Sequence, residues 1–306
     1  MSMEELTLEA PDGHRIAARF RAADAEARGL VQVAHGLAEH CARYARFADA
    51  LAAAGWAVVT HDHRGHGKSA RSARELGHFA DEQGWLRVRE DLRQVRAAGR
   101  ERVPEGPLVL FGHSMGSFIS LSDQLDAPGS VDRLVLSGSN QGGGALVSAG
   151  LAAAKLERLR QGKRGKSKLL AFLSFGSFNK GFEGRTEFDW LSRDEAEVDR
   201  YVADPWCGFD ATNQLWIDLL EALLDNGRPE RLRRIPPELP IYLLAGDRDP
   251  VSQGGKGVRA LERQLRDAGA RDVTRRLYAD ARHEMLNETN RDEVVADLVA
   301  WLARGA

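Results

Sequence analysis

The residues with the clearest chemical potential form the pentapeptide Gly112-His113-Ser114-Met115-Gly116, which directly follows the apolar run Leu108–Phe111. A Gly-x-Ser-x-Gly pattern between a predicted strand and a predicted helix is typical of a sharp turn that exposes a serine hydroxyl. The flanking glycines allow such a turn without a Cβ clash, and the helix N-terminus directs N–H groups towards a developing oxyanion. Ser114 is therefore a candidate nucleophile.

A serine nucleophile needs a base and an orienting acid, and later parts of the chain supply both residue types. Asp247 and Asp249 follow the apolar run Leu243–Ala245, and His283 follows the run that ends at Tyr278. An imidazole, with a pKa of about 6.5, can take the serine proton and return it at neutral pH. A carboxylate fixes the imidazole tautomer and stabilises the imidazolium. The order serine, aspartate, histidine along the chain predicts a serine hydrolase, with either aspartate as the acid.

These residues can meet only if the surrounding elements bring several strand ends to one edge of a sheet. Residues 6–9 and 15–20 flank Pro11-Asp12-Gly13, which predicts an antiparallel hairpin. Further strands are predicted at residues 30–34, 56–60, 108–111, 131–137, 240–245 and 273–278. Amphipathic spacing predicts helices near residues 44–51, 85–95, 118–121, 146–159, 211–224, 258–265 and 292–302. Because strands and helices alternate, we expect an α/β fold with a mostly parallel central sheet flanked by helices.

The alternation of strands and helices stops after Ser137 and resumes near Pro240, about a hundred residues later. We interpret residues 139–236, called the inserted segment below, as a largely helical lid inserted between two strands. Ligands of such folds bind at the carboxyl edge of the sheet, where this insertion begins. The predicted division is a core of residues 1–138 and 237–306 and a lid of residues 139–236.

The composition excludes several classes of protein. The chain has 306 residues, 43% of them hydrophobic, and a net charge of −2, which does not favour nucleic-acid binding. No apolar run approaches the length of a membrane span, and Met1–Glu5 lacks the features of a signal peptide. Cys41 and Cys207 are expected to be reduced thiols in a cytoplasmic protein. The sequence leaves the oligomeric state open.

Motifs along nearly the whole chain carry a resemblance to a known family. The chain resembles the monoglyceride lipase and lysophospholipase branch of the α/β-hydrolase superfamily, often called serine aminopeptidase-like. The motifs that carry the resemblance are Ala34-His35-Gly36-Leu37-Ala38-Glu39-His40, His61-Asp62-His63-Arg64-Gly65-His66-Gly67-Lys68-Ser69, Gly112-His113-Ser114-Met115-Gly116, Gly246-Asp247-Arg248-Asp249-Pro250-Val251 and His283. The resemblance implies an α/β-hydrolase fold in which Ser114 is the nucleophile, Asp249 the orienting acid and His283 the base.

The same resemblance implies an oxyanion hole built from the backbone N–H groups of Leu37 and Met115. The turn His35-Gly36 follows the third predicted strand, so it can direct the next N–H group towards the same oxygen as that of Met115. Such donors contribute roughly 10²–10³ each in rate. One position departs from the family, which usually has a small residue, often glycine, where Ser117 stands; serine is small enough for close packing of helix on strand.

The sequence indicates the substrate-binding residues less clearly than the catalytic ones. The basic loop Lys163–Lys168 precedes an aromatic stretch, for which the sequence leaves two interpretations. The aromatic side chains form either the core of the lid or an apolar surface that holds an acyl chain and contacts membranes or micelles. The predicted substrate-binding residues are His35, His113, Phe172, Phe175 and Phe178.

The pattern His61, His63 and His66 resembles part of a binuclear zinc signature. That signature needs an aspartate before the last histidine, and Gly65 stands there. We therefore interpret the loop as packing beside the nucleophile strand, and we expect no metal and no cofactor.

These observations predict a serine hydrolase (a carboxylic ester hydrolase) that cleaves single-acyl-chain esters, such as monoacylglycerols or lysophospholipids, through an acyl-enzyme. One alternative is an aminopeptidase or amidase with the same triad, which would need an acidic subsite for a free amine. A second is a non-catalytic ligand-binding relative. Residues that could form the acidic subsite are Glu183, Glu187, Asp189 and Asp194.

Overall fold

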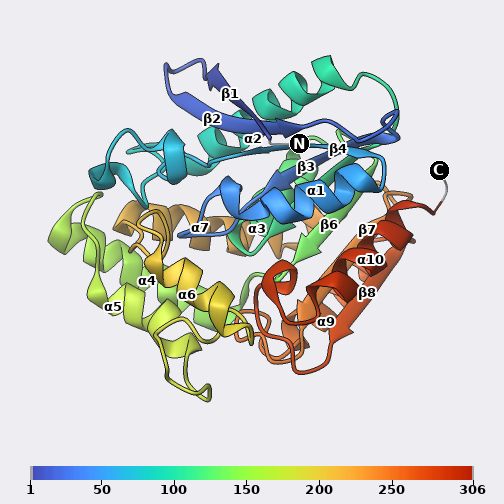
Figure 1. Cartoon of the computed structure of the whole chain (residues 1–306). Coiled ribbons are helices and arrows are strands. Elements are labelled where there is room, and N and C mark those ends of the chain that lie inside the picture. Colours follow the sequence, from blue (N-terminus) through green and yellow to red (C-terminus); the bar gives the residue numbers. More distant parts are fainter. Residues whose placement is uncertain (1–2, 305–306) are drawn as a thin grey trace.

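Eight strands form one continuous sheet in this computed structural model, in the order β1-β2-β4-β3-β5-β6-β7-β8 (Figure 1). The structure describes residues 3–304, so Met1 and Ser2 of the N-terminal stretch lie outside it. β1 and β2 form an antiparallel hairpin at one edge, β2 pairs antiparallel with β4, and the other neighbouring strands pair in parallel. The strands are β1 (Glu4–Glu9), β2 (Arg15–Arg21), β3 (Gly29–Ala34), β4 (Trp56–His61), β5 (Leu108–His113), β6 (Arg133–Ser137), β7 (Ile241–Gly246) and β8 (Val273–Tyr278).

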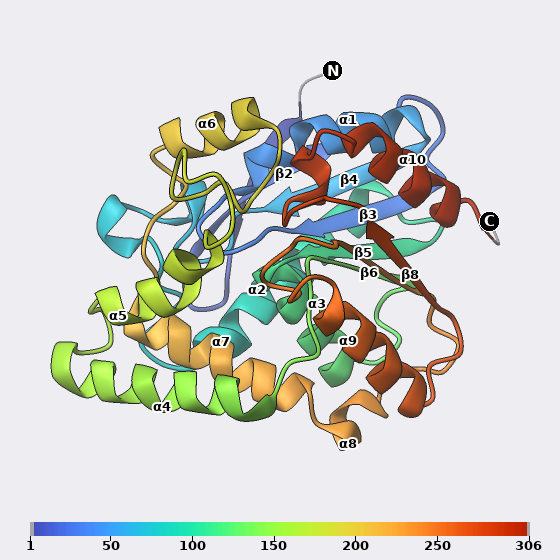
Figure 2. The same ribbon diagram turned by 90° about the horizontal axis from the view of Figure 1, so that it is seen from below.

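Helices cover both faces of the sheet (Figure 2). α1 (Ala45–Ala53) and α10 (Arg291–Leu302) lie on one face, and α2 (Gly84–Arg102), α3 (Met115–Asp126) and α9 (Lys256–Asp267) lie on the other. Successive residues of a strand point to opposite faces, so both faces of the central strands must be apolar. In β3, Val31 and Val33 join the core under α1 and α10, while Leu30 and Ala34 join the core under α2 and α3. The predicted α/β fold is confirmed.

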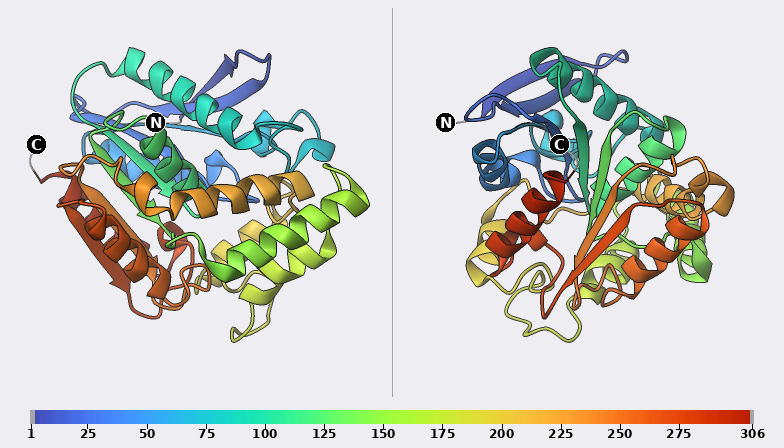
Figure 3. Two further views of the ribbon diagram at one scale, coloured as in Figure 1. Left: turned by 180° about the vertical axis from the view of Figure 1, so that it is seen from behind. Right: turned by 90° about the vertical axis from the view of Figure 1, so that its right-hand side faces the viewer.

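The inserted segment (139–236) lies between β6 and β7 and is largely helical. α7 packs against α4 along much of its length and also contacts α3 and α2, so it shares the main hydrophobic core (Figure 3). The helices are α4 (Gly144–Gln161), α5 (Lys168–Ala171), a π-helical turn (Phe172–Gly176), α6 (Glu195–Ala203), α7 (Asn213–Asn226) and α8 (Pro229–Leu232).

Short 3-10 turns complete the connections at Cys41–Tyr44, Gly67–Ser69, Ala73–Glu75 and Met285–Asn287. Within residues 3–304, every helix is too short or too polar to cross a membrane.

Candidate active site

Ser114 lies at the junction of β5 and α3 in a backbone conformation that serine rarely adopts, with φ 51° and ψ −120°. Two neighbours hold this turn. The Ser114 N–H donates to the carbonyl of Ser137 at the end of β6 (2.8 Å), and the Ser114 carbonyl accepts from the N–H (2.8 Å) and the hydroxyl (2.6 Å) of Ser117. Strained residues of this kind persist where the surrounding structure over-determines them, often at functional sites. Ser117, the departure from the family pattern, therefore helps to fix the serine turn.

The glycines beside Ser114 are needed for close approach rather than for a positive φ angle. A Cβ atom on Gly112 would lie 2.5 Å from the Ser120 hydroxyl and against the Gly116 carbonyl. A Cβ atom on Gly116 would lie 2.5 Å from the His35 carbonyl oxygen and would also meet the carbonyl of Ala34. Since β3 and α3 touch through backbone atoms here, no side chain fits between them.

Asp249 and His283, at the carboxyl ends of β7 and β8, form a buried pair. The distance between His283 Nδ1 and Asp249 Oδ1 is 2.9 Å, and the same oxygen accepts the Val251 N–H at 2.9 Å. Burial by itself lowers the pKa of His283, but the charge and hydrogen bond of Asp249 outweigh it, so the pKa lies above its usual value. Burial by itself raises the pKa of Asp249, yet His283 keeps that pKa below its usual value. The pair suits a histidine base held by an ionised carboxylate.

The serine turn and the histidine meet at the same edge of the sheet. The ring of His113, the residue before Ser114, has its centroid 4.7 Å from that of His283. A Cβ atom on Gly138, just beyond β6, would lie 2.8 Å from His283 and 3.3 Å from His113. The Trp190 ring also packs on His283, with centroids 5.1 Å apart. The inserted segment thus contributes a wall to this site.

The turn after β3 lies directly beside Ser114. A Cβ atom on Gly36 would be 3.3 Å from the Ser114 Cβ atom. The Gly36 N–H donates to Glu39 Oε1 (2.6 Å), which fixes the turn. Across residues 3–304, neither the N–H of Leu37 nor that of Met115 is found donating a hydrogen bond to another group of the protein. Neither predicted oxyanion donor therefore has a competing acceptor within the described residues.

A buried charge network, which sequence reasoning missed, connects this turn to the histidine loop. Arg43 Nη1 lies 2.8 Å from Glu39 Oε2, and Arg43 also makes two hydrogen bonds to Glu284. Burial alone would raise the pKa of Glu284, but Arg43 overrides it and holds that pKa at about 2. Glu39 belongs to the motif after β3, three residues beyond Gly36, and that spacing was the available signal.

The four histidines near the serine turn pack against one another in the interior. His35 accepts the His63 N–H at Nε2 (2.9 Å) and donates from Nδ1 to the Gly36 carbonyl (2.7 Å). The rings of His61 and His66 both pack edge-on to that of His63, and burial lowers the pKa of all four histidines. His35 is thus a neutral side chain that shapes the turn preceding Leu37.

The predicted aromatic substrate-binding residues occupy different positions. Phe178 packs on Trp190 with ring centroids 5.1 Å apart, so the Trp190 ring connects it to His283. Phe172 is 57% exposed on the outer surface of the inserted segment. The side chain of Phe175 lies outside the described part of the structure. The structure therefore brings His113 and Phe178 towards His283 but leaves Phe172 at the surface.

The strand order, the strained serine turn and the order of the three site residues along the chain are those of α/β-hydrolases, and this is the class that the fold defines. Residues 25–290 match the model of the family described as Serine aminopeptidase, S33. The chain belongs to this family.

Several curated or solved proteins are similar to this chain over most of their length. The monoacylglycerol lipase of Mycolicibacterium smegmatis is 30% identical and aligns over 91% of this chain and 89% of its own. The monoglyceride lipase of Rattus norvegicus is 28% identical over 95% of this chain and 88% of its own. The crystal structure of a highly thermostable carboxyl esterase from Bacillus coagulans in complex with glycerol has a TM-score of 0.90 and 29% identity, with 99% and 98% of the two chains covered.

Proposed function

We propose that this protein is a serine hydrolase that cleaves the ester bond of monoacylglycerol-type substrates. The observation that carries the proposal is the buried Asp249–His283 pair, which packs beside the strained turn of Ser114. The names of the similar proteins, monoacylglycerol lipase and carboxyl esterase, support an ester of a single acyl chain.

In the proposed acylation step, Ser114 Oγ attacks the ester carbonyl while His283 Nε2 takes the serine proton. His283 Nδ1 keeps its proton towards Asp249, which stabilises the imidazolium that forms. The oxygen of the tetrahedral intermediate accepts hydrogen bonds from the N–H groups of Leu37 and Met115. His283 then protonates the leaving glycerol oxygen, and an acyl-enzyme remains on Ser114.

In the proposed deacylation step, the same residues act on water. His283 takes a proton from a water molecule, the resulting hydroxide attacks the acyl carbonyl, and His283 returns the proton to Ser114 Oγ. The fatty acid leaves and the enzyme is restored. Because the donors and the base are fixed by the fold before substrate binds, little reorganisation accompanies either step.

An aminopeptidase would need a free acidic group near the site. Three of the four candidate carboxylates have other partners, and the fourth, Glu187, is an exposed side chain. Glu183 accepts two hydrogen bonds from Arg282, Asp194 caps α6 and pairs with Arg291, and Asp189 accepts backbone N–H groups of its own loop. This arrangement favours the ester substrate over the amide.

We propose that residues 1–138 and 237–306 carry out the chemistry and that the inserted segment recognises the acyl chain. Trp190 in the inserted segment packs on His283, and Phe178 packs on Trp190, which supports this assignment. We also propose that this segment makes transient contact with a membrane or micelle, because it contains exposed apolar side chains and the basic loop Lys163–Lys168. Within that loop, Lys163 pairs with Glu82 and Arg164 with Asp81. The exposed side chains are Leu146, Leu156, Leu159, Leu169, Phe172 and Leu173.

A substrate panel tests the proposed function. We expect turnover of 1-monoacylglycerols that is lost in Ser114→Ala, and turnover of aminoacyl anilides that is much slower or absent. Lysophosphatidylcholine in the same panel separates a monoacylglycerol lipase from a lysophospholipase. Hydrolysis of the anilides alone would overturn the proposal of an ester substrate.

A further inference from the structure

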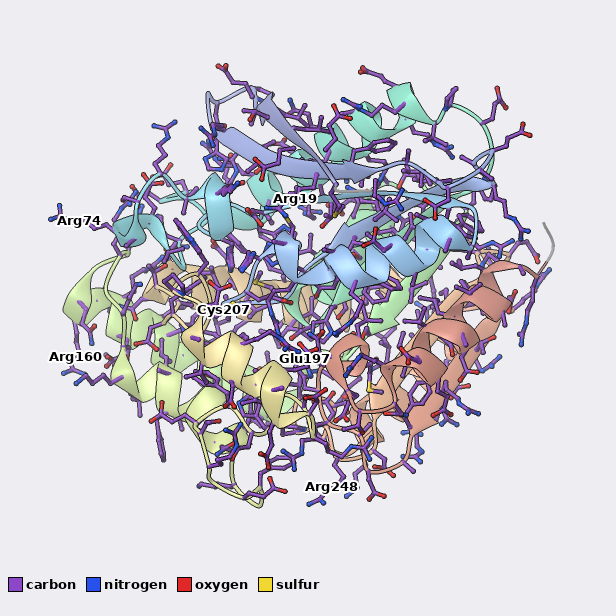
Figure 4. The ribbon with its side chains drawn as sticks, viewed as in Figure 1. Arg19, Arg74, Arg160, Glu197, Cys207 and Arg248 are labelled. Carbon is purple, nitrogen blue, oxygen red and sulfur yellow. The ribbon has the colours of Figure 1, made fainter. Side chains whose placement is uncertain are left out.

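Three side chains with metal-binding atoms converge where the inserted segment meets the loop after β3. They are His40, Asp204 and Cys207, and one ligand atom of each lies within 4.8 Å of the other two. His40 Nε2 is 2.8 Å from Asp204 Oδ2. Figure 4 labels Cys207 at this junction, between the N-terminal part of the chain and α6. None of the three takes part in the proposed hydrolysis.

A backbone hydrogen bond joins the loop after β3 to the loop after α6. The three side chains therefore extend from backbone segments that are fixed relative to each other. The N–H of Gly208, next to Cys207, donates to the carbonyl of Ala38 (2.9 Å). Asp204 Oδ1 accepts the N–H of Trp206 (2.8 Å), which leaves Oδ2 facing His40. The Cys207 N–H donates to the Asp204 carbonyl (3.0 Å), and this turn brings the thiol back beside the carboxylate.

An imidazole, a carboxylate and a thiolate are all ligands of Zn²⁺, and three protein ligands leave a fourth position for water. With bonds of about 2.0 Å to nitrogen and oxygen and 2.3 Å to sulfur, tetrahedral ligand atoms lie roughly 3.3–3.6 Å apart. The observed spacing needs only small side-chain movements to reach this geometry. We propose that His40, Asp204 and Cys207 bind a divalent transition-metal ion, with Zn²⁺ as the best match.

An ion can reach this site from solvent. A surface cavity of about 370 Å³ is lined by both His40 and Asp204, which gives the ion a path and a water molecule room. The arginines that line the cavity do not present unbalanced charge, because each is ion-paired: Arg43 with Glu39 and Glu284, and Arg46 and Arg200 with Glu197.

Metal binding here would join parts of the chain that are far apart in sequence. His40 and Asp204 are separated by 164 positions, and His40 stands three residues after Leu37. An ion bound only by the folded chain stabilises the folded state by mass action, in proportion to the logarithm of its free concentration over Kd. Zn²⁺ should therefore raise the melting temperature of the protein, and above Kd the rise should continue with the logarithm of the Zn²⁺ concentration, whatever reaction the protein catalyses.

The test uses the full-length protein and two metal probes. Co²⁺ should bind with one ion per chain and give a thiolate-to-cobalt charge-transfer band in the near ultraviolet, and Zn²⁺ should displace it. Loss of a group that merely orients a ligand already costs about 10–100-fold in affinity, so loss of a ligand should weaken Zn²⁺ binding by at least 100-fold. We expect that loss in Cys207→Ser and Asp204→Asn.

Cys41→Ser is the matched control, because Cys41 is the other cysteine of the chain and lies buried next to His40. It should retain the cobalt band and the Zn²⁺ affinity. The proposal is overturned if the unaltered protein gives no stoichiometric thiolate band. It is also overturned if Cys207→Ser binds Zn²⁺ as tightly as the unaltered protein does.

Discussion

Arg43 makes a two-pronged contact with Glu284, with Nη1 and Nη2 2.6 and 2.7 Å from the two carboxylate oxygens. Glu284 directly follows His283, and Arg43 also donates to Glu39, which holds the N–H of Gly36. One guanidinium therefore joins the loop of the proposed base to the turn of the proposed oxyanion donor. This largely buried cation therefore bridges two parts of the proposed machinery.

Arg43→Ala should destabilise the protein strongly. The substitution leaves Glu39 and Glu284 buried without their cation, and breaking a buried ion pair costs about 3–5 kcal/mol. Chemical denaturation followed by circular dichroism measures the change. Arg271→Ala is the control, since its pairing with Glu238 is exposed and should contribute less than about 1 kcal/mol. Equal unfolding midpoints for the two variants would argue against the role given to Arg43.

Asp249→Asn should slow hydrolysis and move its pH dependence. His283 acts as a base only when neutral, so its raised pKa places the acid limb of kcat/KM above about pH 6.5. Without the carboxylate, burial dominates and lowers the pKa of His283, so the acid limb of kcat/KM should move to lower pH. We also expect kcat to fall by about 10⁴-fold.

Asp247→Asn is the matched control for the pH profile, because Asp247 is exposed at the same strand end. It should leave both the rate and the limb unchanged. If Asp247→Asn reproduced the effect expected of Asp249→Asn, the assignment of the orienting acid would have to be reversed.

Gly116→Ala should abolish the native serine turn. The new Cβ atom would meet the carbonyls of Ala34 and His35, which are backbone atoms that cannot move aside cheaply. We expect loss of soluble or active protein. Gly150→Ala, in α4, is the control: its Cβ would lie 3.6 Å from the nearest atom, a Leu220 side-chain carbon, and alanine should stabilise that helix by up to about 1 kcal/mol. Normal activity of Gly116→Ala would contradict the close approach of β3 and α3.

Substitution of the exposed leucines of the inserted segment should weaken contact with lipid. Leu146 and Leu159 are 81% and 82% exposed, so changing both to serine costs the fold little. Sedimentation with phospholipid vesicles should show less bound protein, while turnover of soluble nitrophenyl esters stays the same. Leu86→Ser, on α2, should leave the binding to vesicles intact. Unchanged binding of the double variant would exclude this surface as the lipid contact.

Local patterns in the sequence predicted most of the fold. The strands from β3 to β7 each carry an apolar run, and most helices carry an apolar stripe at helical spacing. α6 was missed because only Val198 and Tyr201 of its nine residues are buried and apolar, so its stripe is too sparse to notice.

The parts of the site that escaped prediction depend on contacts distant in sequence. Arg43 and Glu284 are 241 positions apart, and Trp190 reaches His283 from a loop of the inserted segment. No local spacing encodes such pairs. The residues that did stand out, Ser114 and Asp249, follow strand ends, where the fold requires a recognisable local motif.

The account depends most on Ser114 being an activated nucleophile, and labelling with a fluorophosphonate probe tests this directly. The unaltered, folded protein should take up one probe per chain, and peptide mapping should place it on Ser114. Ser117→Ala should still be labelled, and Ser114→Ala should not. Folded protein that resists the probe, or a label on another residue, would contradict the proposed mechanism.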